Sequence, residues 1–118
     1  MDGMVEVSRV RFEELVKDAL DRVPEPLLRA LDNVVVQVED ENVDEPHLLG
    51  LYSGIDLTRR SHEYSFALPD AITIYRLPLQ RLCATEDELA GQIAVTVVHE
   101  LGHHFGIDDD RLHELGWG

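Results

Sequence analysis

The segment from His99 to Asp109 reads HELGHHFGIDD, in which two histidines four residues apart enclose a glutamate that directly follows the first. If this segment is helical, His99 and His103 lie one turn apart on the same face, so both imidazoles can bind one metal ion. Glu100 then points about 100° further around the helix, where its carboxylate can reach a water beside the metal without being a ligand. No other feature constrains the chain as strongly, because this one requires a helix that presents polar groups at its end.

Two further residues extend the pattern to HExxHxxGxxD. Gly106 can adopt the backbone angles that end a helix and turn the chain, and we expect this turn to bring Asp109 to the same metal as a third ligand. Asp108 is an alternative, with a less suitable offset from Gly106. Three protein ligands and one water are typical of a catalytic zinc site, although two histidines and a carboxylate also suit iron or nickel. The simpler alternative, a polar helix end with surface histidines, leaves these polar residues on an otherwise apolar helix unexplained.

The extended motif resembles that of the metzincin branch of the zincin metallopeptidases, HExxHxxGxx followed by His or Asp. Other words along the chain resemble the short, single-domain bacterial zincin-like metallopeptidases that are often called minimal zincins. These words are Asn33–Val36, Leu48–Tyr52, Leu68–Asp70 followed by Ile72–Tyr75, and Leu115–Trp117. The resemblance implies a zinc site on a compact α+β fold and peptidase activity, with His99, His103 and Asp109 as the metal ligands and Glu100 as the general base.

One feature of the metzincins has no counterpart in this sequence. Metzincins have a methionine turn beneath the metal, downstream of the third ligand, whereas the methionines of this chain are Met1 and Met4. We therefore expect the floor of the site to be built in another way, which bears on efficient proteolysis more than on metal binding. A zinc-bearing peptide-binding or regulatory module with little or no turnover is accordingly the second function that the sequence allows.

Composition restricts the partners and the location of the protein. Its 118 residues, of which 44% are hydrophobic, fit one domain over residues 1–118 with a small core. The formal net charge of −14 opposes binding to nucleic acid, which also argues against a metal-dependent ribonuclease. No run approaches the ~18 apolar residues of a membrane span, and residues 1–10 contain no signal-peptide core. Free cysteines behave as small apolar residues, so we expect Cys83, the single cysteine, to be buried. A chain with one cysteine cannot form an internal disulfide, which indicates a cytoplasmic protein. The expected partner is a peptide or protein substrate.

Hydrophobic periodicity predicts an α+β fold of the zincin type, a small mixed sheet packed on an N-terminal helix and a long helix that carries the motif. Helices are expected at 8–22, 27–31, 78–83, 86–105 and 111–116, and strands at 34–39, 48–52, 64–68 and 71–75. Ser8 can cap the first helix, and a capping box at Thr85–Glu88 begins the long one. Along the long helix, four residues at four-residue spacing are expected to face the core: Leu89, Ile93, Val97 and Leu101.

Strand order is less constrained than strand location. The almost entirely apolar segment 48–52 is expected to be a central strand, and segments 64–68 and 71–75 can form a hairpin. In zincins an edge strand beside the active-site helix holds an extended peptide through backbone hydrogen bonds. Either hairpin segment can serve, with 64–68 preferred, and the alternative is an edge strand that binds no ligand. The candidate substrate-binding residues are Tyr64, Phe66 and Leu68. The candidates for stabilising the oxyanion are Tyr52, Tyr75 and His113.

Overall fold

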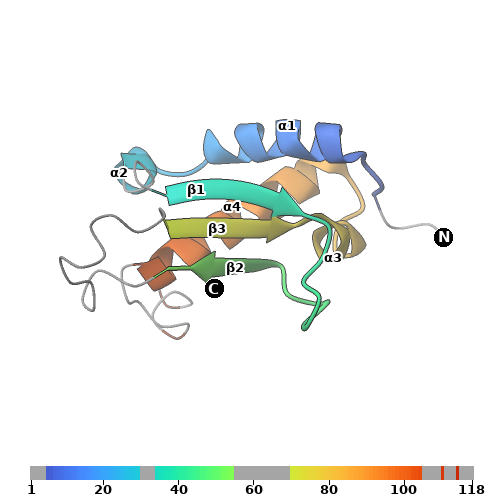
Figure 1. The fold of residues 1–118 in the computed structure, drawn as a ribbon. Helices are drawn as coiled ribbons and strands as arrows, with labels where there is room; N and C mark the ends of the chain where they lie inside the picture. The colour runs from blue at the N-terminus through green and yellow to red at the C-terminus, as the bar shows by residue number, and fades with distance from the viewer. Residues whose placement is uncertain (1–4, 30–33, 55–69, 105–109, 111–113, 115–118) are drawn as a thin grey trace.

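The computed structural model describes residues 5–29, 34–54, 70–104, 110 and 114. In chain order, their elements are α1 (Arg9–Leu20), α2 (Glu25–Arg29), β1 (Val34–Glu39), β2 (Gly50–Ser53), β3 (Asp70–Tyr75), α3 (Arg76–Arg81) and α4 (Glu86–His104). The combination of helices with a small mixed sheet confirms the α+β class (Figure 1). The strand predicted at 64–68 lies outside the described residues, as does most of the helix predicted at 111–116.

The helices begin where local chemistry allows. Ser8 caps α1 as predicted, because its Oγ accepts a hydrogen bond from the Arg11 backbone N–H at 3.1 Å. The short helices α2 and α3 each begin two residues earlier than the prediction. The reason is that Pro26 and Pro78 fall in the first turn of these helices, where a proline needs no hydrogen-bond donor and does not interrupt the helix.

The three described strands form a mixed sheet in the order β1-β3-β2. β1 runs parallel to β3, with Val34 opposite Asp70, and β2 runs antiparallel to β3, with Gly50 opposite Ile74. Among the described strands β3 occupies the centre and β2 pairs along one of its sides, so the expectation that 48–52 is a central strand is not met within this part of the sheet. β3 is accordingly not an edge strand either. Its position also explains its burial, since both neighbouring strands flank it and helices cover one face.

The core lies between one face of the sheet and the helices α1 and α4. In Figure 1, α4 crosses behind the sheet and α1 runs along the side of β1. The inner sheet face contributes alternate residues of β1 and β3, and α4 contributes its predicted stripe of Leu89, Ile93, Val97 and Leu101, all of which are buried. This packing fixes α4 against β2 and β3, and thereby fixes the position of the motif at its C-terminal end. No helix within the described ranges is both long and apolar enough to cross a membrane.

Polar contacts hold the N-terminal end of α4. Thr85 Oγ1 accepts from the Glu88 backbone N–H at 3.1 Å, and the Glu88 carboxylate accepts from the Ala84 backbone N–H at 2.7 Å. This is the predicted reciprocal cap, with the return bond made one residue earlier than in the standard capping box. Two arginines of the N-terminal region bind the same turn, Arg11 to Glu86 and Arg22 to Asp87, each at 2.7 Å.

Candidate metal centre

The C-terminal end of α4 brings the two motif histidines together. His99 and His103 are both half-buried, and their ring centroids are 5.0 Å apart with an angle of 43° between the ring planes. A histidine nitrogen bonds zinc at about 2.0–2.1 Å, which puts its ring centroid about 3.2 Å from the metal. Centroids 5.0 Å apart would then subtend about 100° at a shared ion, close to the tetrahedral angle of zinc sites. The separation of the two rings is therefore compatible with one shared zinc ion.

Glu100 lies on an adjacent face of α4, beneath β2. Its side chain is buried, and its Oε1 accepts a hydrogen bond from the Tyr52 backbone N–H at 3.0 Å. β2 can approach this face closely because Gly50 has no side chain. A Cβ at Gly50 would lie 2.6 Å from Thr96 Cγ2 and 3.3 Å from Glu100 Cγ. The backbone of a strand thus helps to hold the glutamate in place.

Asp70 joins this arrangement from the first position of β3. Its carboxylate is only 3% exposed, and its Oδ2 accepts a hydrogen bond from the Tyr52 hydroxyl at 2.8 Å. Asp70 falls between the two segments predicted to form a hairpin and was given no role, whereas the structure places it on the buried face of β3. The sequence does hold one indication of this role, the charge of Asp70, because a carboxylate at the start of a buried strand needs hydrogen-bond donors.

Several predicted site residues lie outside the described residues. They are Asp108, Asp109, His113, Tyr64, Phe66 and Leu68. Over 5–29, 34–54, 70–104, 110 and 114, no three His, Cys, Asp or Glu side chains are grouped to hold a metal. The described part of the site therefore supplies two imidazoles, and Asp109 stays a prediction for the third ligand.

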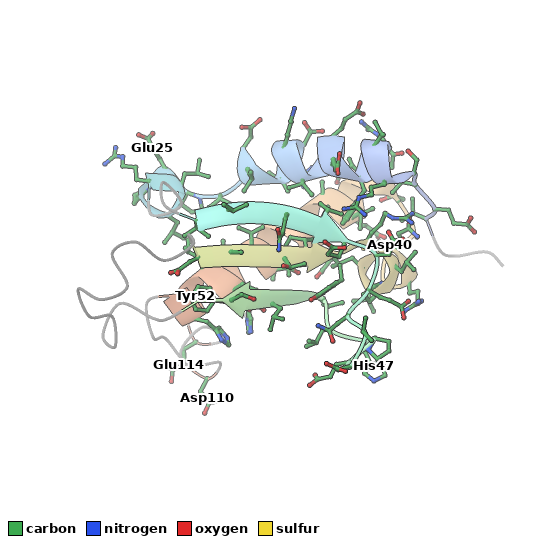
Figure 2. All side chains as sticks on the ribbon, viewed as in Figure 1. Glu25, Asp40, His47, Tyr52, Asp110 and Glu114 are labelled. Atoms are coloured by element: carbon green, nitrogen blue, oxygen red, sulfur yellow. The ribbon has the colours of Figure 1, made fainter. Side chains whose placement is uncertain are left out.

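The other polar residues lie at both ends of the molecule (Figure 2). Tyr75 is at the opposite end of β3 from Asp70, and its hydroxyl accepts a hydrogen bond from Asn42 Nδ2 at 2.9 Å. Figure 2 shows Tyr52, Asp110 and Glu114 toward one end of the molecule, and His47 toward the other. Both His47 and Asp110 are exposed. Of the tyrosines proposed as oxyanion donors, only Tyr52 is therefore close to Glu100 among the described residues.

Cys83 is a structural residue. It is 2% exposed and belongs to the core cluster, as predicted. Burial raises the pKa of its thiol, and the nearby Glu88 carboxylate raises it further. Because the thiolate is the reactive form of cysteine, a raised pKa keeps Cys83 a poor nucleophile at neutral pH.

Comparisons with known proteins show the family to which the chain belongs. Residues 31–117 match the family model described as zincin-like metallopeptidase. Among solved structures, the chain is similar to a conserved hypothetical protein from Thermus thermophilus, with 27% sequence identity, a TM-score of 0.53, and coverage of 92% of this chain and 97% of that one. No curated protein matches the sequence. Since the family model spans most of the chain, including all three described strands and the helix with the HExxH motif, the protein belongs to the zincin-like metallopeptidase family.

Proposed function

We propose that this protein is a zinc-dependent metallopeptidase that hydrolyses peptide bonds in peptides or proteins. The observation that supports the proposal most directly is the pairing of two imidazoles, 5.0 Å apart at the end of α4, with an adjacent glutamate held against β2. Family membership supports the same class of reaction. A ligand pair beside a buried carboxylate is typical of catalytic zinc sites, which keep one position for water or substrate.

The donor set that would hold the metal is His99, His103 and Asp109. Two neutral imidazoles and one carboxylate suit zinc, and the carboxylate offsets part of the metal charge. When bound, zinc supplies polarisation of the scissile carbonyl and activation of a water molecule. Because His99 and His103 are half-buried at a helix end and not enclosed in the core, the site remains accessible to a substrate.

Glu100 is the general base in this proposal. Its carboxylate takes a proton from the attacking water and passes it to the leaving amine. Both transfers require that the carboxylate keeps one orientation, and the hydrogen bond from the Tyr52 N–H to Oε1 restrains its rotation. Tyr64, Phe66 and Leu68 stay the candidates for contact with the substrate backbone, on the segment 64–68 that is expected to be an edge strand.

Replacement of the base tests the assignment. We expect Glu100→Gln to lower kcat by about 10²–10⁴-fold, while zinc bound per protein, measured by metal analysis, stays at the wild-type value. Cleavage is measured with a peptide library by mass spectrometry, and Glu45→Gln, an exposed change in the loop after β1, is the matched control that leaves kcat unchanged. Undiminished cleavage by Glu100→Gln would refute the assignment.

The same experiment separates the second candidate function. The methionines of the sequence, Met1 and Met4, both precede the motif, and this favours a zinc-bearing peptide-binding module with slow turnover. In that case library peptides bind saturably to the zinc-loaded protein, and neither wild type nor Glu100→Gln cleaves them. A single cysteine also favours a reducing compartment, the cytoplasm, for either function.

A further inference from the structure

We propose that Asp70 and Tyr52 are positioning residues for the candidate base, and that they act by holding β2 in the place where the Tyr52 N–H can bind Glu100. Neither side chain is given a part in the chemical steps described above. The inference deepens the proposed function and rests on it for its kinetic consequence. Its structural consequence, the placement of one backbone amide, can be measured without any substrate.

Tyr52 links Glu100 on α4 to Asp70 on β3 through two hydrogen bonds. Its backbone N–H donates to Glu100 Oε1 at 3.0 Å, and its side-chain hydroxyl donates to Asp70 Oδ2 at 2.8 Å. The two bonds leave the same residue in different directions, one toward α4 and one toward β3. Because one end of Tyr52 is fixed by Asp70, the amide at the other end has a defined position relative to Glu100.

Asp70 is well placed to serve as the fixed point. It is 3% exposed on the central strand of the described sheet, and its register opposite Val34 of β1 is set by the parallel pairing. A hydrogen bond from a hydroxyl to an ionised carboxylate is stronger than one between neutral groups. β2 is only four residues long and pairs with β3 alone among the described strands, so this side-chain bond adds a second restraint.

Two glycines adapt the chain to this arrangement. Gly50, at the start of β2, allows contact with Thr96 and Glu100 on α4, as described above. Gly54, just after β2, has φ = +148°, and a Cβ there would lie 2.4 Å from Asp70 Oδ1. The strand therefore rests against α4 at one end and against the Asp70 carboxylate at the other, and Tyr52 lies between these two contacts.

A catalytic role for the Tyr52 hydroxyl is the rival explanation. A hydroxyl has one proton to donate, and here it is donated to Asp70. If the hydroxyl instead stabilised the oxyanion, loss of Asp70 would release it for that task and would not lower kcat through Tyr52. The two explanations thus predict different behaviour when Asp70 alone is changed.

The first measurement is the proton chemical shift of the amide at position 52, recorded by NMR on the zinc-loaded protein. A bond to a carboxylate moves an amide proton downfield, and Glu100→Ala gives the shift in the absence of that bond. We expect Tyr52→Phe and Asp70→Ala each to move the resonance upfield toward the Glu100→Ala value. Asp70→Asn, which retains an oxygen acceptor, should retain most of the wild-type shift. Tyr75→Phe removes a hydroxyl from the far end of β3 and should leave the shift unchanged.

The second measurement is kinetic. We expect Tyr52→Phe and Asp70→Ala each to lower kcat by about tenfold, the effect of one misplaced hydrogen bond, with KM and zinc content at wild-type values. The double variant should be no slower than the slower single one, because both changes break the same link. Asp70→Asn should recover most of the lost kcat.

Each outcome decides something. An amide shift that stays at the wild-type value in both Tyr52→Phe and Asp70→Ala overturns the inference, and so does a kcat loss that is confined to Tyr52→Phe. If Asp70→Ala does not fold, Tyr52→Phe and Asp70→Asn still provide the comparison. If no variant or wild type cleaves peptides, the proposed function fails, and the amide shift still decides whether Asp70 and Tyr52 position Glu100.

Discussion

The two halves of α4 differ in what holds them and in what they present. The first half is bound at its start by the Thr85 cap and by two arginines of the N-terminal region. The second half places Thr96 and Glu100 beneath β2. Since the stripe that begins at Leu89 stays buried through Leu101, both halves share one core-facing side and differ on the other sides.

This difference shows how a small domain can tolerate polar groups at its functional end. Buried or half-buried His and Glu side chains lower stability unless each is hydrogen-bonded or binds a ligand. The caps, the ion pairs and the apolar stripe stabilise the helix independently of those groups. We therefore expect changes in the first half to alter stability with little effect on activity, and changes around the second half to do the reverse.

The largest stability loss is expected from Ile93→Ala. Ile93 is fully buried in the core stripe, and removing a buried isoleucine side chain to alanine costs about 2–5 kcal/mol. The free energy of unfolding is measured by urea denaturation, with Leu82→Ala, at a residue 63% exposed, as the control that changes it by less than about 0.5 kcal/mol. Zinc content and kcat per folded molecule should stay at wild-type values. A large loss of kcat in the folded fraction would contradict the division between the halves.

Gly50→Ala should have a smaller effect on stability and a larger one on activity. The new methyl group would lie 2.6 Å from Thr96 Cγ2 and 3.2 Å from the Thr73 carbonyl oxygen, so β2 must move away from α4. Such overpacking costs about 1–3 kcal/mol. Movement of β2 also displaces the Tyr52 N–H from Glu100, and a misplacement of about 1 Å can lower the rate by 10²-fold. Unfolding and peptide cleavage are measured on the same preparation.

Gly91→Ala is the matched control, because it adds the same methyl group to the first half of α4. Among the described residues, a Cβ at Gly91 would come near Arg22 Nη1 alone, at the ordinary distance of 3.6 Å. Alanine is favoured over glycine inside a helix by about 0.5–1 kcal/mol, so this variant should be more stable than wild type with unchanged kcat. Equal losses of activity in both variants would show that any disturbance of α4 reaches the site.

The same contrast explains what the sequence could reveal. The first half of α4 was predictable, because its cap and apolar stripe depend on residues within a few positions of one another. The pairing of His99 with His103 follows from helix geometry in the same way. Local pattern did not give the order of the described strands, because the apolar segment 48–52 indicated a central strand, yet β3 lies between β1 and β2 and Leu51 is exposed.

The hydrogen bonds that join Asp70, Tyr52 and Glu100 could not be predicted from local sequence pattern either. Tyr52 is 48 residues from Glu100 and 18 from Asp70 along the chain, and only the pairing of β2 with β3 brings the three together. The spacing of these three residues along the chain does not predict the order of the strands in the sheet. The sequence indicated Tyr52 as a possible oxyanion donor, whereas its hydroxyl donates a hydrogen bond to Asp70, a residue that was given no role.

A smaller change in stability is expected from Thr85→Ala. Thr85 Oγ1 accepts from the Glu88 N–H at the start of α4, and loss of such a cap costs about 1 kcal/mol. Thr85→Ser keeps the hydroxyl and should stay within a few tenths of wild type. Thermal denaturation followed by circular dichroism measures both, and metal content should not change in either. An unaltered melting temperature in Thr85→Ala would mean that the ion pairs alone hold this end of the helix.

The smallest effect is expected from Glu86→Gln, and its pH dependence distinguishes it from other causes. The hydrogen bond from Arg11 lowers the pKa of the Glu86 carboxyl. A group whose pKa is lower in the folded state stabilises the protein above its unfolded pKa, about 4.3 for glutamate, and loses this contribution as the pH falls through the folded value. Wild type should therefore be more stable than Glu86→Gln near pH 6, and the difference should disappear at acidic pH. It should also shrink in high salt, because both side chains are over 40% exposed.

At a net charge of −14, removal of one negative charge also relieves repulsion, which acts in the opposite direction. If relief of repulsion dominates, Glu86→Gln is the more stable protein near pH 6, and the link between α1 and α4 then depends on the apolar stripe and not on the Arg11–Glu86 pair.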